Sequence, residues 1–303
     1  MSYQLTIQRP VETEGIGLHT AVHSRVRFVP APADTGIVFR RVDLDNFEIE
    51  AHVRNVARVS YATSLMKQGV LLSTTEHVLA ALYSCGVDNV YVEIDALELP
   101  ILDGSAKPFI DLLAKAGTRQ LRRQRRYIRV LKPLEFVDGD KRLGIYPADE
   151  FRVHCFVDYH HPACGPQEVE LAVNRETFSH ELAPARTFGF TKDFAGLQAM
   201  GLIRGGSLEN AIVMDDKGVM NGPLRFPDEF GRHKALDLIG DLALVGRPLL
   251  ARIEAHKAGH ASHTQLVTRL LADRSLWAET TNGHHPSRKT EDVSVSLSAP
   301  ASS

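Results

Sequence analysis

The chain has 303 residues, of which 44% are hydrophobic and 24% are charged, and its formal net charge is -2. These values are typical of a soluble globular protein with a sizeable core, and they exclude a global basic bias toward nucleic acid. No stretch approaches the roughly twenty consecutive apolar residues of a membrane-spanning helix, and the start lacks the pattern of a secretory signal. Its three cysteines contain no C-x-x-C pair, which argues against a disulfide scaffold or a cysteine zinc site. We therefore expect a cytoplasmic protein with no integral membrane segment and no nucleic-acid partner.

Residues 1–122 are predicted to form one α+β unit. Strands are expected at residues 3–7, 24–30, 36–42 and 89–95, and turns are expected at residues 12–17 and 31–36. A helix is predicted to begin at Ser73, with Ser73 as N-cap and Glu76 completing a capping box, and to end at Gly86. A second helix is predicted over residues 103–117.

A locally basic stretch near residues 118–126 follows, and we interpret it as a solvated linker rather than as a site for an anionic surface. Residues 127–279 are predicted to form a second α+β unit, because the strand–turn–strand pattern of residues 127–148 faintly echoes the opening of the chain. The helices of this unit are expected near 192–201, 228–246 and 262–274. Residues 280–303 are polar, and we predict a disordered tail in which His284 and His285 are solvated.

The helix expected at 228–246 carries a polar stripe on an otherwise apolar pattern. His233, Asp237 and Asp241 are spaced four residues apart, so they stack on one side of the helix over consecutive turns. Such a pair can be an ordinary surface contact worth a few tenths of a kcal/mol. Imidazole and carboxylate are also ligands of Zn²⁺-like ions, and a third ligand would then have to come from elsewhere in the chain.

Two other segments could complete such a site. His77 follows Glu76 at the start of an apolar helix; its alternatives are a metal ligand or a hydrogen-bonded core histidine, while a capping box alone explains Glu76. His260, in HKAGHAS, precedes a predicted helix start at Ser262, a position that suits a general acid and equally a loop histidine. Gly205 and Gly206 permit a close backbone approach to a ligand, or simply a turn.

Several motifs occur together and in order: GIGLH (15–19), STTEHVLAAL (73–82), LPILDGSAKPF (99–109), ARTFGF (185–190), GGSLENAIV (205–213), DEFGRHKALDLIGDL (228–242) and HKAGH (256–260). Over residues 3–277 the chain resembles the UDP-3-O-acyl-N-acetylglucosamine deacetylase family of lipid A biosynthesis. The resemblance implies two similarly built α+β domains, each a sheet packed on helices, with the helices facing each other and the site between them. It also implies a catalytic Zn²⁺ held by His77, His233 and Asp237, with the fourth position open for water.

The resemblance further implies the chemistry, which is hydrolysis of the N-acetyl group with release of acetate. Glu76 would be the general base, Thr187 would help to hold the oxyanion, and His260 would be the cationic acid, kept charged by Asp241. Substrate would be bound by these candidates: Lys234, Phe188, Lys257, Gly206, Leu197 and Met200. The last two lie in residues 192–203, where an acyl channel or an ordinary amphipathic helix is expected.

The chain departs from the usual family pattern at two places. Ser262 and His263 stand where two asparagines are usual, and Pro223 and Pro227 lie in a shortened segment before the polar helix. Two other functions remain as alternatives: a catalytically silent sugar-nucleotide-binding paralogue, and a zinc amidase acting on another N-acetylated substrate. Fe²⁺ is conceivable with the same ligands. We expect a monomer.

Overall fold

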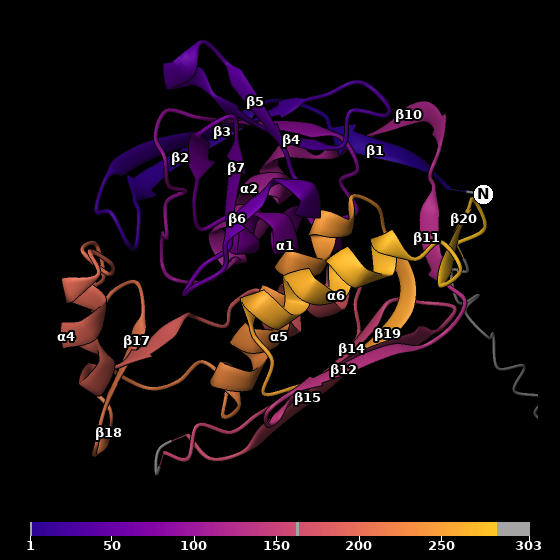
Figure 1. The fold of residues 1–303 in the computed structure, drawn as a ribbon. Helices are drawn as coiled ribbons and strands as arrows, with labels where there is room; N and C mark the ends of the chain where they lie inside the picture. Colours follow the sequence, from indigo (N-terminus) through magenta and orange to yellow (C-terminus); the bar gives the residue numbers. More distant parts are fainter. Residues whose placement is uncertain (1, 162–163, 284–303) are drawn as a thin grey trace, which may run out of the picture.

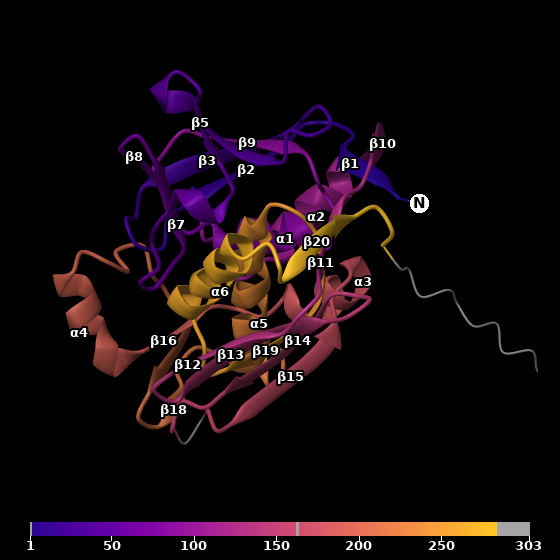
Figure 2. The same ribbon diagram turned by 45° about the vertical axis from the view of Figure 1, so that its right-hand side comes forward.

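The computed structural model describes residues 2–161 and 164–283. Its elements are stacked in layers (Figure 1): a first sheet, the helices α1 (Glu76–Ser84) and α2 (Lys107–Ala116), the helices α5 (Glu229–Leu242) and α6 (His260–Ala272), and a second sheet. The two helix layers face each other in the middle of the molecule (Figure 2). The predicted α+β class, with sheets packed on facing helices, is confirmed.

The first sheet has five strands in the order β2-β3-β9-β4-β5. Beside it, β1 pairs with β10, and β6, β7 and β8 form a small sheet of their own. The strands and short helices of this part are β1 (Tyr3–Ile7), β2 (Val11–Ile16), β3 (His23–Pro30), β4 (Ile37–Arg41), η1 (Val42–Leu44), β5 (Phe47–Glu50), η2 (Val53–Asn55), β6 (Val56–Arg58), β7 (Ser64–Lys67), β8 (Val70–Leu72), β9 (Val90–Ile94) and β10 (Thr118–Gln124).

The second sheet centres on β19, which pairs with β13, β14 and β11. The remaining elements of this part are β11 (Tyr127–Val130), β12 (Leu134–Asp138), β13 (Lys141–Pro147), β14 (Arg152–Val157), β15 (Gln167–Ala172), α3 (Arg175–Thr177), η3 (Phe178–Leu182), β16 (Phe188–Phe190), α4 (Thr191–Ala199), β17 (Ile212–Asp215), β18 (Gly218–Val219), η4 (Ala243–Val245), β19 (Leu249–His256) and β20 (Trp277–Thr280).

The two sheets share one topology. In the first, β9 runs antiparallel to β3 and parallel to β4; in the second, β19 runs antiparallel to β13 and parallel to β14. The central facing residues are Phe28, Val92 and Phe39 in the first sheet and Ile145, Ile253 and Val153 in the second, all fully buried. The echo between the two halves of the sequence therefore corresponds to a repeat in the fold. The unit limits 1–122 and 127–279 stay a prediction.

One continuous apolar core joins the two units. It contains side chains from both sheets and from the helices between them, including Leu79 of α1 and Leu236 and Ile239 of α5. Burying a leucine or isoleucine side chain stabilises the fold by roughly 1.5–3 kcal/mol each. The core therefore holds α1 and α5, which carry the candidate site residues, at a fixed separation.

The structure corrects two expectations. The basic stretch near 118–126 is not a solvated linker, because β10 occupies most of it and pairs with β1, with Thr118 opposite Ile7. Residues 12–17 are not a turn, because β2 runs through Val11–Ile16 as an edge strand of the first sheet. Both segments lack an alternating apolar pattern because neither strand has a fully buried face.

The predicted helices of the second unit are present, with shifted ends. α5 ends at Leu242, where the short η4 follows and Gly246 closes the turn at a φ of 83°. α6 begins at His260 rather than at Ser262, so that His260 belongs to its first turn. The predicted disordered tail, residues 280–303, begins too early: Thr280 is the last residue of β20 and pairs with Tyr127, and the carbonyl of Asn282 accepts from Nη2 of Arg129 at 3.4 Å. Residues 284–303 lie outside the described residues.

A smaller substructure lies at one side of the molecule, on the left in Figure 1. It contains α4 and the three-stranded sheet β16-β17-β18, with a separate apolar cluster around Ile212, Met214 and Phe230. Among the described helices, none combines the length and apolar character needed to cross a membrane.

Candidate active site

Three side chains from two helices meet at the centre of the molecule. His77 lies on the first turn of α1, and His233 and Asp237 lie on successive turns of α5. Oδ1 of Asp237 is 3.7 Å from Nε2 of His77 and 3.4 Å from Nε2 of His233. All three residues are buried, and their donor atoms lie within 4.8 Å of one another. Two ligands of a tetrahedral Zn²⁺ with bonds near 2.0–2.1 Å are about 3.4 Å apart, so this group fits such an ion.

The imidazole of His233 is oriented by a backbone carbonyl. Its Nδ1 donates a hydrogen bond to the oxygen of Ala185 at 3.1 Å, which leaves Nε2 without a proton and facing Asp237. Burial lowers the pKa of His233 to about 4, so the ring is neutral near neutral pH. A neutral ring with a bare Nε2 is the form that binds a metal.

A buried ion pair fixes the segment that supplies this carbonyl. Glu229 begins α5 and is fully buried, and its two carboxylate oxygens accept from Nε and Nη2 of Arg186 at 2.9 and 3.1 Å. Burial by itself would raise the pKa of Glu229, but the hydrogen bonds from Arg186 outweigh it and lower that pKa. The pair ties ARTFGF (185–190) to the start of α5, and so places Ala185 beside His233 and Thr187 at the site.

The capping-box expectation for Glu76 is wrong. α1 begins at Glu76, its N-cap is Thr75, and Ser73 bonds instead to the hydroxyl of Ser64 at 3.0 Å. Oε2 of Glu76 accepts from the backbone N–H of Thr63 at 3.0 Å. Burial raises the pKa of Glu76, in spite of the opposing charges of His260 and His77. The capping-box explanation of Glu76 therefore fails, and Glu76 is a buried carboxylate that lines the same cavity as His77, His233 and Asp237.

The close packing of α1 on α5 depends on a glycine. A Cβ at Gly240 would collide with the backbone carbonyl of Glu76. Because Gly240 has no side chain, the first turn of α1 can lie directly on α5. This contact brings Glu76 and His77 beside the stripe formed by His233 and Asp237.

Asp241 is the centre of a second buried cluster. Its Oδ2 accepts from Nδ1 of His260 at 2.7 Å and from Nδ1 of His263 at 2.8 Å, and its Oδ1 accepts from the hydroxyl of Thr63 at 2.5 Å. Two ligands of one ion would be about 3.4 Å apart. The shorter spacing shows hydrogen bonds, so this cluster holds Asp241 in place and is not arranged around a metal.

These contacts set the charges of the cluster. Burial disfavours the imidazolium form of His260, but the adjacent Asp241 carboxylate outweighs burial and raises the pKa of His260 to about 9. For His263 burial prevails and the pKa is lowered, even though that ring bonds to the same carboxylate. His260 is therefore the cation of the pair, and its Nε2 lies 4.0 Å from Oδ2 of Asp237.

A cavity of about 340 Å³ opens at this point between the two units. Glu76, Thr187, His260 and the three possible metal ligands line it. It is also lined by several residues that the sequence did not single out: Leu18, Val59, Tyr61, Ile101 and Lys141. Polar groups of the predicted catalytic types thus converge on one concave surface.

The predicted substrate-binding residues divide into two groups. Phe188 and Lys234 line the cavity, with Nζ of Lys234 5.4 Å from the centre of the Phe188 ring and 2.8 Å from Oδ2 of Asp237. The other four do not line it. Lys257 pairs with Asp158 at 3.3 Å, and Gly206 lies one layer out, near Leu18.

The other two predicted substrate-binding residues, Leu197 and Met200, lie at α4. Leu197 is buried in α4, and Met200, which caps that helix, is 58% exposed. Neither residue lines the cavity, so the cavity stops short of α4.

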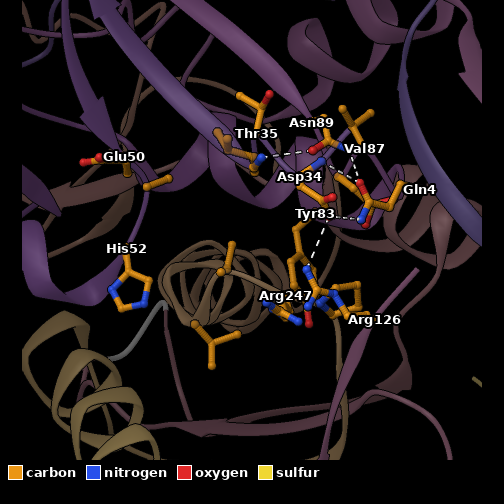
Figure 3. A pocket seen from close by; sticks show the side chains of 18 of the residues that line it. Gln4, Asp34, Thr35, Glu50, His52, Tyr83, Val87, Asn89, Arg126 and Arg247 are labelled. Carbon is orange, nitrogen blue, oxygen red and sulfur yellow. Dashed lines mark hydrogen bonds and ion pairs between the residues drawn. The ribbon is translucent and has the colours of Figure 1, made fainter. Parts of the chain in front are cut away.

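A larger cavity, of about 490 Å³, lies where the C-terminal ends of α1 and η4 approach each other (Figure 3). Its four arginines are each paired with a carboxylate: Arg125 with Asp88 at 2.8 Å, Arg126 with Asp34 at 3.3 Å, Arg247 with Glu279 at 2.9 Å and Arg54 with Glu50 at 3.7 Å. Within the described part of the chain, the two groups of clustered possible metal ligands both lie elsewhere. We therefore assign the chemistry to the smaller cavity.

Besides the newly found lining residues of the smaller cavity, two residues that hold the polar groups of the site in place were given no role from the sequence. Thr63 lies in an unremarked stretch before β7, and nothing local marks its contacts with residues 13 and 178 positions away. His263 was visible only as a departure from the usual asparagine. Its hydrogen bond to Asp241 shows that it occupies a structural position in the buried cluster.

A family model and several named proteins that are similar to this chain carry the same description. A family model described as UDP-3-O-acyl N-acetylglycosamine deacetylase matches residues 4–272. A protein of Solibacter usitatus named UDP-3-O-acyl-N-acetylglucosamine deacetylase is 54% identical over 96% of this chain and 99% of its own length. Proteins of the same name from an Anaeromyxobacter species and from Syntrophotalea carbinolica are 45% and 43% identical, covering 98% and 91% of this chain and 95% and 90% of their own lengths.

Proposed function

We propose a reaction for this site from one premise: the chain belongs to the UDP-3-O-acyl N-acetylglycosamine deacetylase family. Its reaction is then the removal of the N-acetyl group from UDP-3-O-acyl-N-acetylglucosamine, in lipid A biosynthesis. In finer detail, we propose that water cleaves the amide with release of acetate, and that this is the committed step of that pathway. The observation that carries the proposal is the buried group His77, His233 and Asp237 with Glu76 beside it.

The proposed cofactor is Zn²⁺, held by His77, His233 and Asp237. When bound, it supplies Lewis acidity, which lowers the pKa of a water molecule and polarises the acetyl carbonyl. Fe²⁺ accepts the same nitrogen and oxygen donors, so metal analysis of the purified protein decides between the two ions.

Glu76 is proposed to take the proton from the attacking water. A general base works best when its pKa lies near the working pH, and burial moves the pKa of Glu76 upward from the ordinary carboxylate value. The N–H of Thr63 holds one carboxylate oxygen at 3.0 Å, which leaves the other to face the water.

His260 is proposed to donate the proton that the leaving amine needs when the C–N bond breaks. With a pKa of about 9 it carries that proton at neutral pH. Its positive charge also stabilises the negative oxygen of the tetrahedral intermediate, and the hydroxyl of Thr187 donates to the same oxygen. Asp241 acts through His260, as the carboxylate that keeps the ring charged and oriented.

Lys234 and Phe188 are proposed to contact the sugar nucleotide, Phe188 by packing on the sugar ring. Lys257 and Gly206 are proposed as outer contacts. For the 3-O-acyl chain we propose the α4 region, with Leu197 and Met200 as apolar contacts reached when substrate extends beyond the cavity. We further propose that the protein acts as a monomer in the cytoplasm.

The test is acetate release from UDP-3-O-acyl-N-acetylglucosamine, measured together with metal content on the purified protein. We expect turnover that depends on the bound metal and falls steeply when the acyl chain is removed from the substrate. Binding of the nucleotide sugar without acetate release would identify a silent paralogue. Equal turnover with and without the acyl chain would point to an amidase with another substrate.

A further inference from the structure

We propose that Thr63 is a positioning residue that fixes Glu76 and the Asp241–His260 pair in one geometry. Its backbone N–H donates to Oε2 of Glu76 at 3.0 Å, and its hydroxyl donates to Oδ1 of Asp241 at 2.5 Å. The same hydroxyl oxygen lies 3.2 Å from Nδ1 of His260. One residue thus touches both sides of the proposed proton-transfer machinery, and the inference rests on the proposed function of those groups.

Thr63 is itself held firmly. Its carbonyl accepts from the backbone N–H of Thr75 at 3.1 Å and from the hydroxyl of Thr75 at 3.0 Å, and its side chain is fully buried. Two residues earlier, Tyr61 adopts a φ of 65°, a left-handed conformation that is uncommon outside glycine and sets the tight bend between β6 and β7. With its N–H, carbonyl and hydroxyl all engaged, Thr63 has little freedom to move.

The hydroxyl of Thr63 decides how the Asp241 carboxylate is turned. Oδ2 of Asp241 already accepts from His260 and His263. Among the hydrogen bonds of the described residues, Oδ1 has the Thr63 hydroxyl as its partner. Without it, a fully buried carboxylate oxygen would lose its donor, and the carboxylate could rotate. Because Nδ1 of His260 is hydrogen-bonded to Oδ2, rotation of the carboxylate would turn the imidazole ring and change where its other nitrogen, Nε2, points.

The contact also crosses between the two units. Thr63 and Glu76 come from the part of the chain before β9, whereas Asp241 and His260 come from α5 and α6. Catalytic groups must be held to within a fraction of an ångström to act together. Thr63 therefore fixes the position of the proposed base, Glu76, relative to the proposed acid, His260, which belongs to the other unit.

The experiment compares Thr63→Val with Thr63→Ser. Valine keeps the shape and the backbone N–H to Glu76 but removes the hydroxyl, whereas serine keeps the hydroxyl and removes the methyl group. We expect Thr63→Val to lower kcat by about tenfold or more, because a loosened Asp241–His260 pair no longer holds the acid in its productive position. KM and bound metal should stay near wild type, and Thr63→Ser should recover kcat to within about threefold. Ser64→Ala, which removes the neighbouring buried hydroxyl, is the matched control and should change little.

A second measurement does not depend on turnover. In ¹⁵N-histidine-labelled holoenzyme, the Nδ1–H proton signal of His260 should shift in Thr63→Val and return in Thr63→Ser. If Thr63→Val does not fold, Thr63→Ala removes the same hydroxyl without placing a methyl group against Asp241. An unchanged kcat and signal in the hydroxyl-free variant would overturn the inference, as would a serine variant as slow as valine. A wild-type protein that releases no acetate would instead refute the proposed function, and the histidine signal would still test the Thr63 contact.

Discussion

Replacing Asp241 by Asn removes one negative charge from the centre of the second cluster while keeping its shape. In the wild type, Oδ2 of Asp241 lies 2.7 Å from Nδ1 of His260, and both groups are largely shielded from water. An opposite charge at this distance favours imidazolium, whereas a neutral amide does not. We therefore expect the basic limb of the rate–pH profile to move to lower pH in Asp241→Asn.

The size of the shift follows from the structure. The pKa of His260 is raised from the ordinary 6.5 to about 9, and each pKa unit corresponds to roughly 1.4 kcal/mol. If Asp241→Asn returns the pKa of His260 to about 6.5, the protonated fraction at pH 8 falls from about 90% to about 3%. The rate at pH 8 should then fall about thirtyfold, while at pH 6 the protonation effect is less than about twofold. A dication in the adjacent site would lower the pKa of His260 in both proteins. The basic limb of Asp241→Asn would still lie at lower pH than that of the wild type.

The assay is kcat/KM between pH 5.5 and 10 for wild type, Asp241→Asn and His260→Gln, with metal content measured for each. His260→Gln should lower kcat/KM by roughly two orders of magnitude, and its rate–pH profile should lack the basic limb. Asp111→Asn, an exposed carboxylate paired with Lys107 on α2, is the charge-matched control and should overlay wild type. An Asp241→Asn profile that overlays wild type would refute the pairing, and loss of metal in that variant would place Asp241 in the metal site.

Three further predictions concern the metal, the helix contact and the tail. Alanine at any of the three proposed ligands should abolish both bound metal and activity, because three protein ligands leave no redundancy; these are His77, His233 and Asp237. Glu76→Ala should keep the metal and lose rate, and elemental analysis giving the reverse pattern would contradict the assignment. Gly240→Ala should lower the free energy of unfolding by about 1–3 kcal/mol in chemical denaturation, because its methyl group meets the Glu76 carbonyl, whereas Gly196→Ala, with open space around it, should not destabilise. Removal of residues 284–303 should leave the melting temperature and activity unchanged, because every described strand pairing is retained; a large loss of either would show that the polar composition was misjudged.

Patterns within a few residues of one another were read correctly from the sequence. The four-residue spacing of His233 and Asp237 predicted that they share a helix face, and α5 places them on successive turns. The apolar periodicity around them predicted the helix itself, and Gly117 ends α2 as expected. These features depend on helix geometry and backbone sterics, which act locally.

Local patterns misled where a distant partner competed for the same group. The sequence S-x-x-E at Ser73–Glu76 has the form of a capping box, yet Glu76 is bonded to Thr63 and Ser73 to Ser64. The basic stretch of β10 reads as a linker because most of its side chains face water. Its order comes from backbone hydrogen bonds to β1, more than a hundred residues away. Such bonds leave no trace in side-chain composition.

The sequence by itself determined the α+β class of this protein, the helix that carries two proposed metal ligands, and the family to which the chain belongs. The family resemblance implied that His77 joins this helix, but only the tertiary structure shows how the two meet: the approach requires the missing side chain of Gly240 across the interface. It also decided that Asp241 receives three hydrogen bonds, from Thr63, His260 and His263. Contacts of this kind join residues that chain connectivity leaves far apart, and burial then fixes their charges, so neither the geometry nor the protonation of the site can be obtained before the two units are packed together.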